Sequence, residues 1–142
     1  MMRQKGNGRD ALLGTIKEEQ AKTDHMSKDA MVRVAETLGL TVGDVYGVTT
    51  FYSFLSTWPL GRHVIRVCKS VPCCMKDAEM LIQWLGKELG INPEETTADG
   101  RFTLTLTNCI GACDQAPAML IDDEVYGQLT PERISEILKS FD

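Results

Sequence analysis

The sequence predicts an α/β fold in two parts: an N-terminal helical bundle over residues 1–60, and a domain over residues 61–142 with a mixed sheet flanked by helices. Three observations support this prediction. Apolar residues recur at helical spacing in the first part. Short segments with alternating apolar residues enclose a helical segment in the second part. Between the two patterns, Trp58-Pro59-Leu60-Gly61 interrupts the chain.

Three helices are predicted in the N-terminal part. Asp10 is expected to cap the first helix, which runs to about Lys22. Ser27 is expected to cap the second, which stops at Gly39, and Thr41 the third. The apolar residues expected on the inner faces are Leu12, Leu13, Ile16, Met31, Val34, Ala35, Leu38, Val45, Val48, Tyr52 and Leu55. Short helices with tight connections are typical of a small bundle.

The second part alternates strands and helices. Strands are expected over residues 62–67, 102–106, 118–121 and 124–126, and helices over 76–89 and from 130 onward, while 94–100 is expected to be a polar loop. The helix between the first two strands allows them to be parallel, and the short connection between the last two requires them to be antiparallel.

Two cysteine pairs follow the two predicted parallel strands. Cys68 and Cys73 have four residues between them, and Cys109 and Cys113 have three. Both pairs would therefore lie at the carboxyl ends of neighbouring strands, where open α/β sheets usually bind ligands. A [2Fe–2S] cluster needs two ligands for each of its irons, and two short cysteine pairs can supply them.

Cysteine spacing alone leaves other readings open. Structural zinc sites use similar short spacings, so a zinc-binding interaction module is an alternative. Disulfides are less favoured, because the N-terminus lacks the apolar run of a secretory signal. A CxxC-type redox site is disfavoured, because neither pair has two intervening residues.

Composition limits the functional classes. The chain has 142 residues, a net charge of −5 and a pI of about 5.0, which argue against a nucleic-acid-binding surface. It has no run of 18 apolar residues that could span a membrane, and we expect a cytoplasmic protein with reduced thiols. His25 and His63 lie outside any ligand pattern and are expected to be ordinary surface or packing residues.

Two longer motifs resemble a known family. Val45-Tyr46-Gly47-Val48-Thr49-Thr50-Phe51-Tyr52 and Asn108-Cys109-Ile110-Gly111-Ala112-Cys113-Asp114-Gln115-Ala116-Pro117 are similar to segments of the thioredoxin-like [2Fe–2S] ferredoxins. Within this family, the chain most resembles the E subunit of NADH–quinone oxidoreductase and related subunits of NAD-linked hydrogenases, including electron-bifurcating ones, and of formate dehydrogenases. The similarity extends from about residue 10 to the end of the chain.

The resemblance implies a thioredoxin-like domain in which Cys68, Cys73, Cys109 and Cys113 bind one [2Fe–2S] cluster. It implies a non-catalytic electron-transfer subunit whose partner is a flavoprotein subunit with FMN, a [4Fe–4S] cluster and the NAD(H) site, together with further iron–sulfur or catalytic subunits. The chain has no Gly-rich dinucleotide fingerprint of its own, which agrees with this role. A free-standing ferredoxin remains an alternative.

Three local expectations complete the sequence-based picture. Only Cys73 of the adjacent thiols Cys73 and Cys74 is expected to be a ligand, and Cys74 is expected to pack as a small apolar residue. The Ala116–Pro117 bond is expected to be cis, because thioredoxin-like folds often place a cis proline beside the thiol site. The segment 51–54 is expected to pack the bundle on the second domain, with a partner-facing patch as the alternative.

Overall fold

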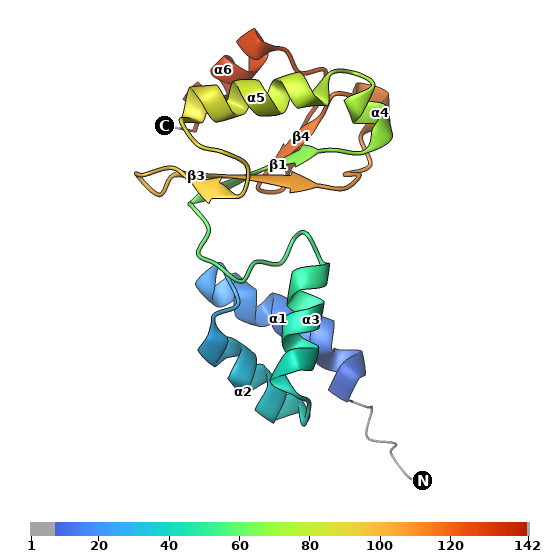
Figure 1. Ribbon diagram of the computed structural model, residues 1–142, viewed down its shortest axis with the longest axis vertical. Helices are drawn as coiled ribbons and strands as arrows, with labels where there is room; N and C mark the ends of the chain where they lie inside the picture. Colours follow the sequence, from blue (N-terminus) through green and yellow to red (C-terminus); the bar gives the residue numbers. More distant parts are fainter. Residues whose placement is uncertain (1–7, 142) are drawn as a thin grey trace. The chain divides into compact units, whose positions relative to one another are not determined.

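The computed structural model describes residues 8–141 of the chain (Figure 1). The chain divides into two compact units, of which the first ends at Pro59 and the second begins at Leu60. Within the described residues, no helix combines the length and the apolar character needed to cross a lipid bilayer.

The first unit consists of three helices that contact one another: α1 (Gly8–Thr23), α2 (Lys28–Leu38) and α3 (Val42–Phe51). Their core contains Leu12, Ile16, Met26, Ala30, Met31, Val34, Ala35 and Val45. The sequence-based inner faces are wrong at two positions. Leu13 is 36% exposed, because only Leu12 and Ile16 share one face of α1 at four-residue spacing. Tyr52 is 43% exposed, because it adopts an extended backbone and ends α3.

The ends of α2 and α3 follow from their capping residues, as the sequence predicts. The Ser27 hydroxyl accepts a hydrogen bond from the backbone N–H of Ala30. Gly39 ends α2 with a left-handed backbone at φ +66°, a conformation that glycine adopts at little cost. Thr41 and Asp44 form a capping box in which each side chain accepts a hydrogen bond from the other residue's backbone N–H.

The second unit contains a five-stranded mixed sheet with the strand order β2-β3-β1-β4-β5. Its strands are β1 (His63–Cys68), β2 (Glu95–Thr96), β3 (Phe102–Thr107), β4 (Met119–Ile121) and β5 (Glu124–Tyr126). The predicted directions are confirmed: β1 and β3 are parallel, and β4 and β5 are antiparallel. Strand β2 lies in the segment predicted as a polar loop, because two polar residues carry no alternation that could reveal a strand.

The two longer helices of this unit, α5 (Ala78–Leu89) and α6 (Pro131–Lys139), cover the same face of the sheet (Figure 1). Their shared core with the strands contains Ile65, Val67, Leu81, Leu85, Phe102, Leu104, Met119, Ile121, Leu129, Ile134 and Leu138. Helix α5 begins two residues later than predicted, because Asp77 adopts a left-handed backbone at φ +61°. A four-residue helix, α4 (Val71–Cys74), precedes it and was not predicted.

One polar contact fastens the start of β1 to the turn between β4 and β5. Asp122 accepts a hydrogen bond from the backbone N–H of Val64 at 2.9 Å and contacts Nδ1 of His63 at 2.7 Å. The His63 ring also packs edge-on against Phe141, with ring centroids 4.9 Å apart. His63 is therefore a packing residue at the end of the sheet opposite the first cysteine pair, as expected from the sequence.

This contact generates a prediction about stability. Asp122→Ala removes both interactions and places alanine at φ +54°, so we expect a loss of about 2 kcal/mol in the free energy of unfolding. Asp122→Asn keeps an oxygen for the Val64 N–H and tolerates this backbone, so it should lose about half as much. Urea unfolding followed by circular dichroism measures both, and a loss below about 0.5 kcal/mol in Asp122→Ala would contradict the role.

Candidate metal centre

The first cysteine pair lies on the loop that leaves β1. Cys68 is the last residue of β1, and Cys73 follows in helix α4. Pro72 is tolerated there, because the first turn of a helix leaves its backbone N–H groups unpaired in any case. Both thiols are buried with 1% exposure, and they pack with Ala78, the first residue of α5.

The second pair lies on the loop that leaves β3. Cys109 follows that strand by two residues, and Cys113 begins a short 3-10 turn, Cys113–Gln115. Between them, Gly111 adopts φ +84°, which turns the loop back so that the two sulfurs come within 3.6 Å of each other. Both of these thiols are exposed. The site therefore has one buried pair and one exposed pair.

Backbone N–H groups point at three of the four sulfurs. The Cys68 sulfur accepts hydrogen bonds from the backbone N–H groups of Ser70 and Ile110. The Cys73 sulfur accepts one from Ala118. Gly111 donates its N–H to the Cys109 sulfur at 3.4 Å. Ile110 and Ala118 belong to the second loop and its continuation, so their hydrogen bonds tie this segment to the sulfurs of the first.

These hydrogen bonds and the close packing shift the thiol pKa values in opposite directions. Burial acts to raise the pKa of Cys68, but hydrogen bonds from Ser70, Cys73 and Ile110 outweigh it and hold the pKa below its usual value. Burial raises the pKa of Cys73 to about 11. The neighbouring Cys109 thiol raises the pKa of Cys113. Negative charges on adjacent sulfurs oppose one another, and bound cations would relieve this repulsion.

The arrangement of the thiols fits a two-iron cluster. The sulfurs lie as two pairs, as two irons with two protein ligands each require. A tetrahedral metal ion with metal–sulfur distances of about 2.3 Å holds two sulfurs about 3.8 Å apart, close to the distance between Cys109 and Cys113.

Comparison with known proteins shows the family. A model of the thioredoxin-like [2Fe–2S] ferredoxins matches residues 1–142 of the chain. The chain belongs to this family. The resemblance stated from its motifs is thereby confirmed, and so is the fold class; the cofactor of the family is a [2Fe–2S] cluster rather than zinc.

The relatives of the chain include components of larger enzymes. The E subunit of NADH-quinone oxidoreductase from Pseudomonas aeruginosa is 40% identical over 133 residues, which are 94% of this chain and 80% of that protein. The corresponding protein of Escherichia coli is 42% identical over the same length and shares. A solved NAD+-reducing [NiFe]-hydrogenase, in its air-oxidized state, is similar with a TM-score of 0.74 and 25% identity over 90% of this chain. The chain spans only 22% of that hydrogenase chain.

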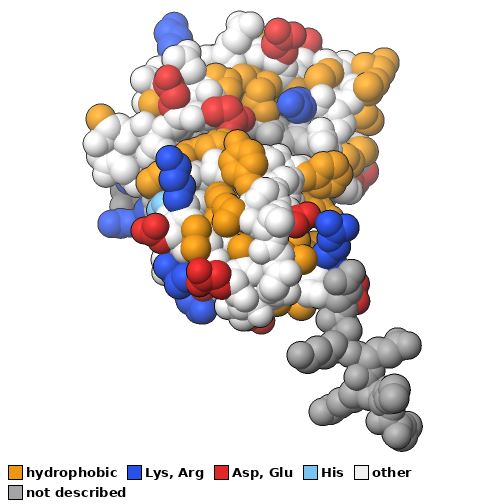
Figure 2. Space-filling view, turned by 60° about the horizontal axis from the view of Figure 1, so that its bottom comes forward, with side chains coloured by type: hydrophobic (Ala, Val, Ile, Leu, Met, Phe, Trp, Pro, Cys, Tyr) orange, Lys and Arg blue, Asp and Glu red, His pale blue; other side chains and the backbone are white. Residues whose placement is uncertain are grey.

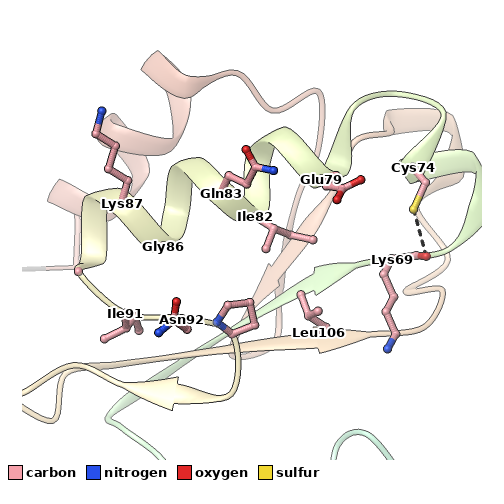
Figure 3. Close-up of a pocket in the computed structure, with 12 residues that line it drawn as sticks. Lys69, Cys74, Glu79, Ile82, Gln83, Gly86, Lys87, Ile91, Asn92 and Leu106 are labelled. Atoms are coloured by element: carbon pink, nitrogen blue, oxygen red, sulfur yellow. Dashed lines mark hydrogen bonds between the residues drawn. The ribbon is translucent and has the colours of Figure 1, made fainter.

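The environment of Cys74 differs from the sequence-based expectation. Its thiol is exposed instead of packed as a small apolar residue, and it donates a hydrogen bond to the Lys69 carbonyl at 3.2 Å. Figure 3 shows this sulfur at one end of a groove of about 720 Å³ that runs along α5 and past Leu106 of β3. Adjacent side chains leave the backbone in different directions, so Cys73 faces the buried core while Cys74 faces the groove.

Two backbone features of the site are the cis peptide bond before Pro117 and the N–H groups directed at the sulfurs. The Ala116–Pro117 bond is cis, which confirms the prediction made from the resemblance. Loop N–H groups directed at the sulfurs are expected from the sequence, because the small residues Gly111 and Ala112 between two ligands permit a close approach. The sequence does not identify the donors as Ser70, Ile110 and Ala118, because a backbone N–H carries no residue-type signal.

The different directions of the adjacent thiols generate a prediction. Cys74→Ala should leave the visible and EPR spectra of the cluster unchanged, because this thiol faces the groove and bonds only a carbonyl there. Cys73→Ala should lose the cluster, or keep it with shifted spectra if Cys74 rotates in as a substitute. A Cys73→Ala/Cys74→Ala double variant separates these two results. Cluster loss in Cys74→Ala together with a native spectrum in Cys73→Ala would reverse the assignment.

Proposed function

We propose that this chain is an electron-transfer subunit in which Cys68, Cys73, Cys109 and Cys113 hold one [2Fe–2S] cluster. The observation that carries the proposal is the convergence of the two cysteine loops at the carboxyl ends of β1 and β3, with backbone N–H groups directed at the sulfurs. Cys68 and Cys73 would bind one iron, and Cys109 and Cys113 the other. When bound, the cluster supplies a carrier for one electron at a time.

The chain's own residues prepare this site for electron transfer. The N–H donors favour negative charge on the sulfurs and hold them in place before a cluster binds. Burial of Cys68 and Cys73 keeps water from one side of the site. The exposed pair, Cys109 and Cys113, is then the side at which electrons enter and leave. No residue of this site is required to bind a substrate or to move a proton.

The proposed partner is a flavoprotein subunit with FMN, a [4Fe–4S] cluster and the NAD(H) site, within a complex that holds further iron–sulfur or catalytic subunits. The names of the relatives support such a complex, since they are a subunit of a quinone oxidoreductase and part of an NAD+-reducing hydrogenase. We place this complex on the cytoplasmic side, where free thiols stay reduced.

Metal and sulfide analysis tests the central proposal. Anaerobically purified chain should contain about two irons and two acid-labile sulfides, and its visible absorption should bleach with dithionite. The control is a variant in which serine replaces all four proposed ligands: Cys68→Ser, Cys73→Ser, Cys109→Ser and Cys113→Ser. This variant should be colourless. A colourless wild-type chain that binds zinc would refute the proposal.

Assay of the isolated chain tests its place in the complex. The purified chain should not oxidise NADH with any dye, because it carries no nucleotide-binding fingerprint. Addition of the flavoprotein subunit should produce NADH-dependent reduction of the cluster, visible as bleaching. Steady NADH oxidation by the chain alone, at a rate independent of added flavoprotein, would contradict the assignment of hydride chemistry to the partner.

A further inference from the structure

After Asp44 in its first turn, helix α3 (Val42–Phe51) carries no charged residue, which is unusual for a helix at a protein surface. Its inner side buries Val45 and Thr49 in the three-helix core. Its outer side carries Val42 and Tyr46, which are 43% and 54% exposed. The only charged residue of α3, Asp44, is occupied in the N-terminal capping box and in an ion pair with Arg9 of α1 at 3.1 Å. Apolar side chains on a helix are normally buried, so the exposure of Val42 and Tyr46 needs an explanation.

The uncharged surface continues beyond the end of α3. From Val45 to Gly61 the sequence contains no charged residue, although a quarter of the whole chain is charged. Phe51 is 79% exposed and contacts Tyr52 edge-on, with ring centroids 5.0 Å apart. Phe54 and Trp58 are also more than 40% exposed. We call these residues the aromatic face; it consists of Val42, Tyr46, Phe51, Tyr52, Phe54 and Trp58. Figure 2 shows that hydrophobic side chains also reach the surface of the molecule in the view it presents.

Hydrogen bonds hold the backbone of the segment after α3 in place. The Gln20 side-chain amide donates to the carbonyl of Phe54 at 2.9 Å and accepts from the N–H of Ser56 at 2.9 Å. The Ser56 carbonyl accepts from the N–H of Met26 at 2.7 Å, and its hydroxyl donates to the carbonyl of Trp58 at 2.7 Å. The exposed aromatic side chains thus stand on a fixed backbone, which lowers the entropy lost when a partner binds.

Two glycines leave room on the outer side of α3. Gly43 and Gly47 are four residues apart and therefore neighbours on one helix face. A Cβ atom added at Gly47 would meet no other atom within 4 Å. Glycine weakens a helix interior relative to alanine, and nothing in the described structure requires its small size here. A partner whose backbone approaches α3 closely would require residues as small as glycine at these positions. Helix pairs that pack closely often have small residues at such four-residue spacing.

We propose that the aromatic face is the surface by which this chain docks on the flavoprotein subunit of its complex, through an uncharged helical segment of that partner. This inference rests on the proposed function. The face exposes about 600 Å², if a fully exposed aromatic residue contributes about 200 Å². That area approaches the roughly 800 Å² that each partner contributes to a stable interface. Aromatic enrichment and missing charge are typical of interface cores.

The chemistry of the face selects a protein as its occupant. Binding to an anionic membrane surface would require lysine or arginine among the aromatic residues, and the segment 45–61 has neither. The hydrogenase that resembles this chain matches 90% of it, so the similarity includes most of the helical unit, yet this region is only 22% of that longer chain. The hydrogenase chain therefore contains a similar helical unit, within a polypeptide that is several times longer than this chain.

Truncation of the exposed aromatic side chains gives the first test. Tagged chain is expressed with the flavoprotein subunit, and FMN per [2Fe–2S] cluster is measured after purification. Phe51→Ser and Tyr46→Ser should each weaken the association by about thirtyfold, as for residues at the centre of an interface. Val32→Ser, on α2 and 40% exposed, is the control and should retain FMN. Iron content and the visible spectrum should be unchanged in all three variants.

Substitution of Gly47 gives a second test, in which the stability of the chain and its association with the flavoprotein should change in opposite directions. Gly47→Gln should raise the melting temperature of the chain alone, because glutamine favours a helix, and yet weaken association with the flavoprotein. Gly14→Gln on α1 is the matched control: a Cβ there also meets nothing within 4 Å, so it should raise the melting temperature and retain FMN. Retention of FMN by both Gly47→Gln and Phe51→Ser would refute the docking surface.

Two further outcomes would also overturn the inference. If the wild-type chain is a dimer that Tyr46→Ser dissociates, the face binds a second copy of the chain. If Phe51→Ser lowers the melting temperature of the chain alone by several degrees, the face is buried within the chain. Failure of the proposed function is separate from these results, because it would show as missing cluster or missing FMN in the wild-type preparation itself.

Discussion

The parallel pairing of β1 with β3 is the constraint on which the metal centre depends. In their register Cys68 lies beside Thr107, so the loops that leave the two strands begin next to each other. Each loop carries one cysteine pair, although α5, β2 and β3 all lie between the two pairs in the sequence. The crossover helix packs on the sheet through Leu81 and Leu85 and thereby fixes this register. Burial of one sheet face makes register specific, since a shift by one residue would expose the core side chains.

The second determinant of the centre is the exchange of hydrogen bonds between the loops. Cys68 is bonded by an N–H from its own loop, at Ser70, and by one from the other loop, at Ile110. Cys73 is bonded by Ala118, directly after the cis proline. Such donors are fixed by the backbone and need no reorganisation when charge on the sulfurs changes. The site thus combines a buried pair, Cys68 and Cys73, with an exposed pair, Cys109 and Cys113.

The helical unit exposes aromatic side chains that its own core does not bury. Its core is small and complete, and the caps at Ser27, Gly39 and Thr41 determine where its helices begin and end. The aromatic residues after Val45 exceed what this core can bury. The sequence predicts that residues 51–54 pack on the second domain, and this stays a prediction. The exposure of Phe51, Tyr52 and Phe54 supports the alternative, in which these residues face a partner. Large exposed apolar patches are uncommon in proteins that act alone.

The sequence by itself determined the order of the helices and the longer strands, the directions of the β1–β3 and β4–β5 pairs, the cysteine pairs and the family. Local rules suffice for these features: helical spacing, capping residues, connection length and motif spacing act between near neighbours. Only the tertiary structure decided the two-residue strand β2, the short helix α4, the exposure of Leu13 and the direction of Cys74 into the groove. It alone showed that Ile110 and Ala118 direct their N–H groups at sulfurs of the first loop. These features depend on contacts between segments far apart in the chain, and every residue except proline carries the same backbone N–H, so no residue type announces them.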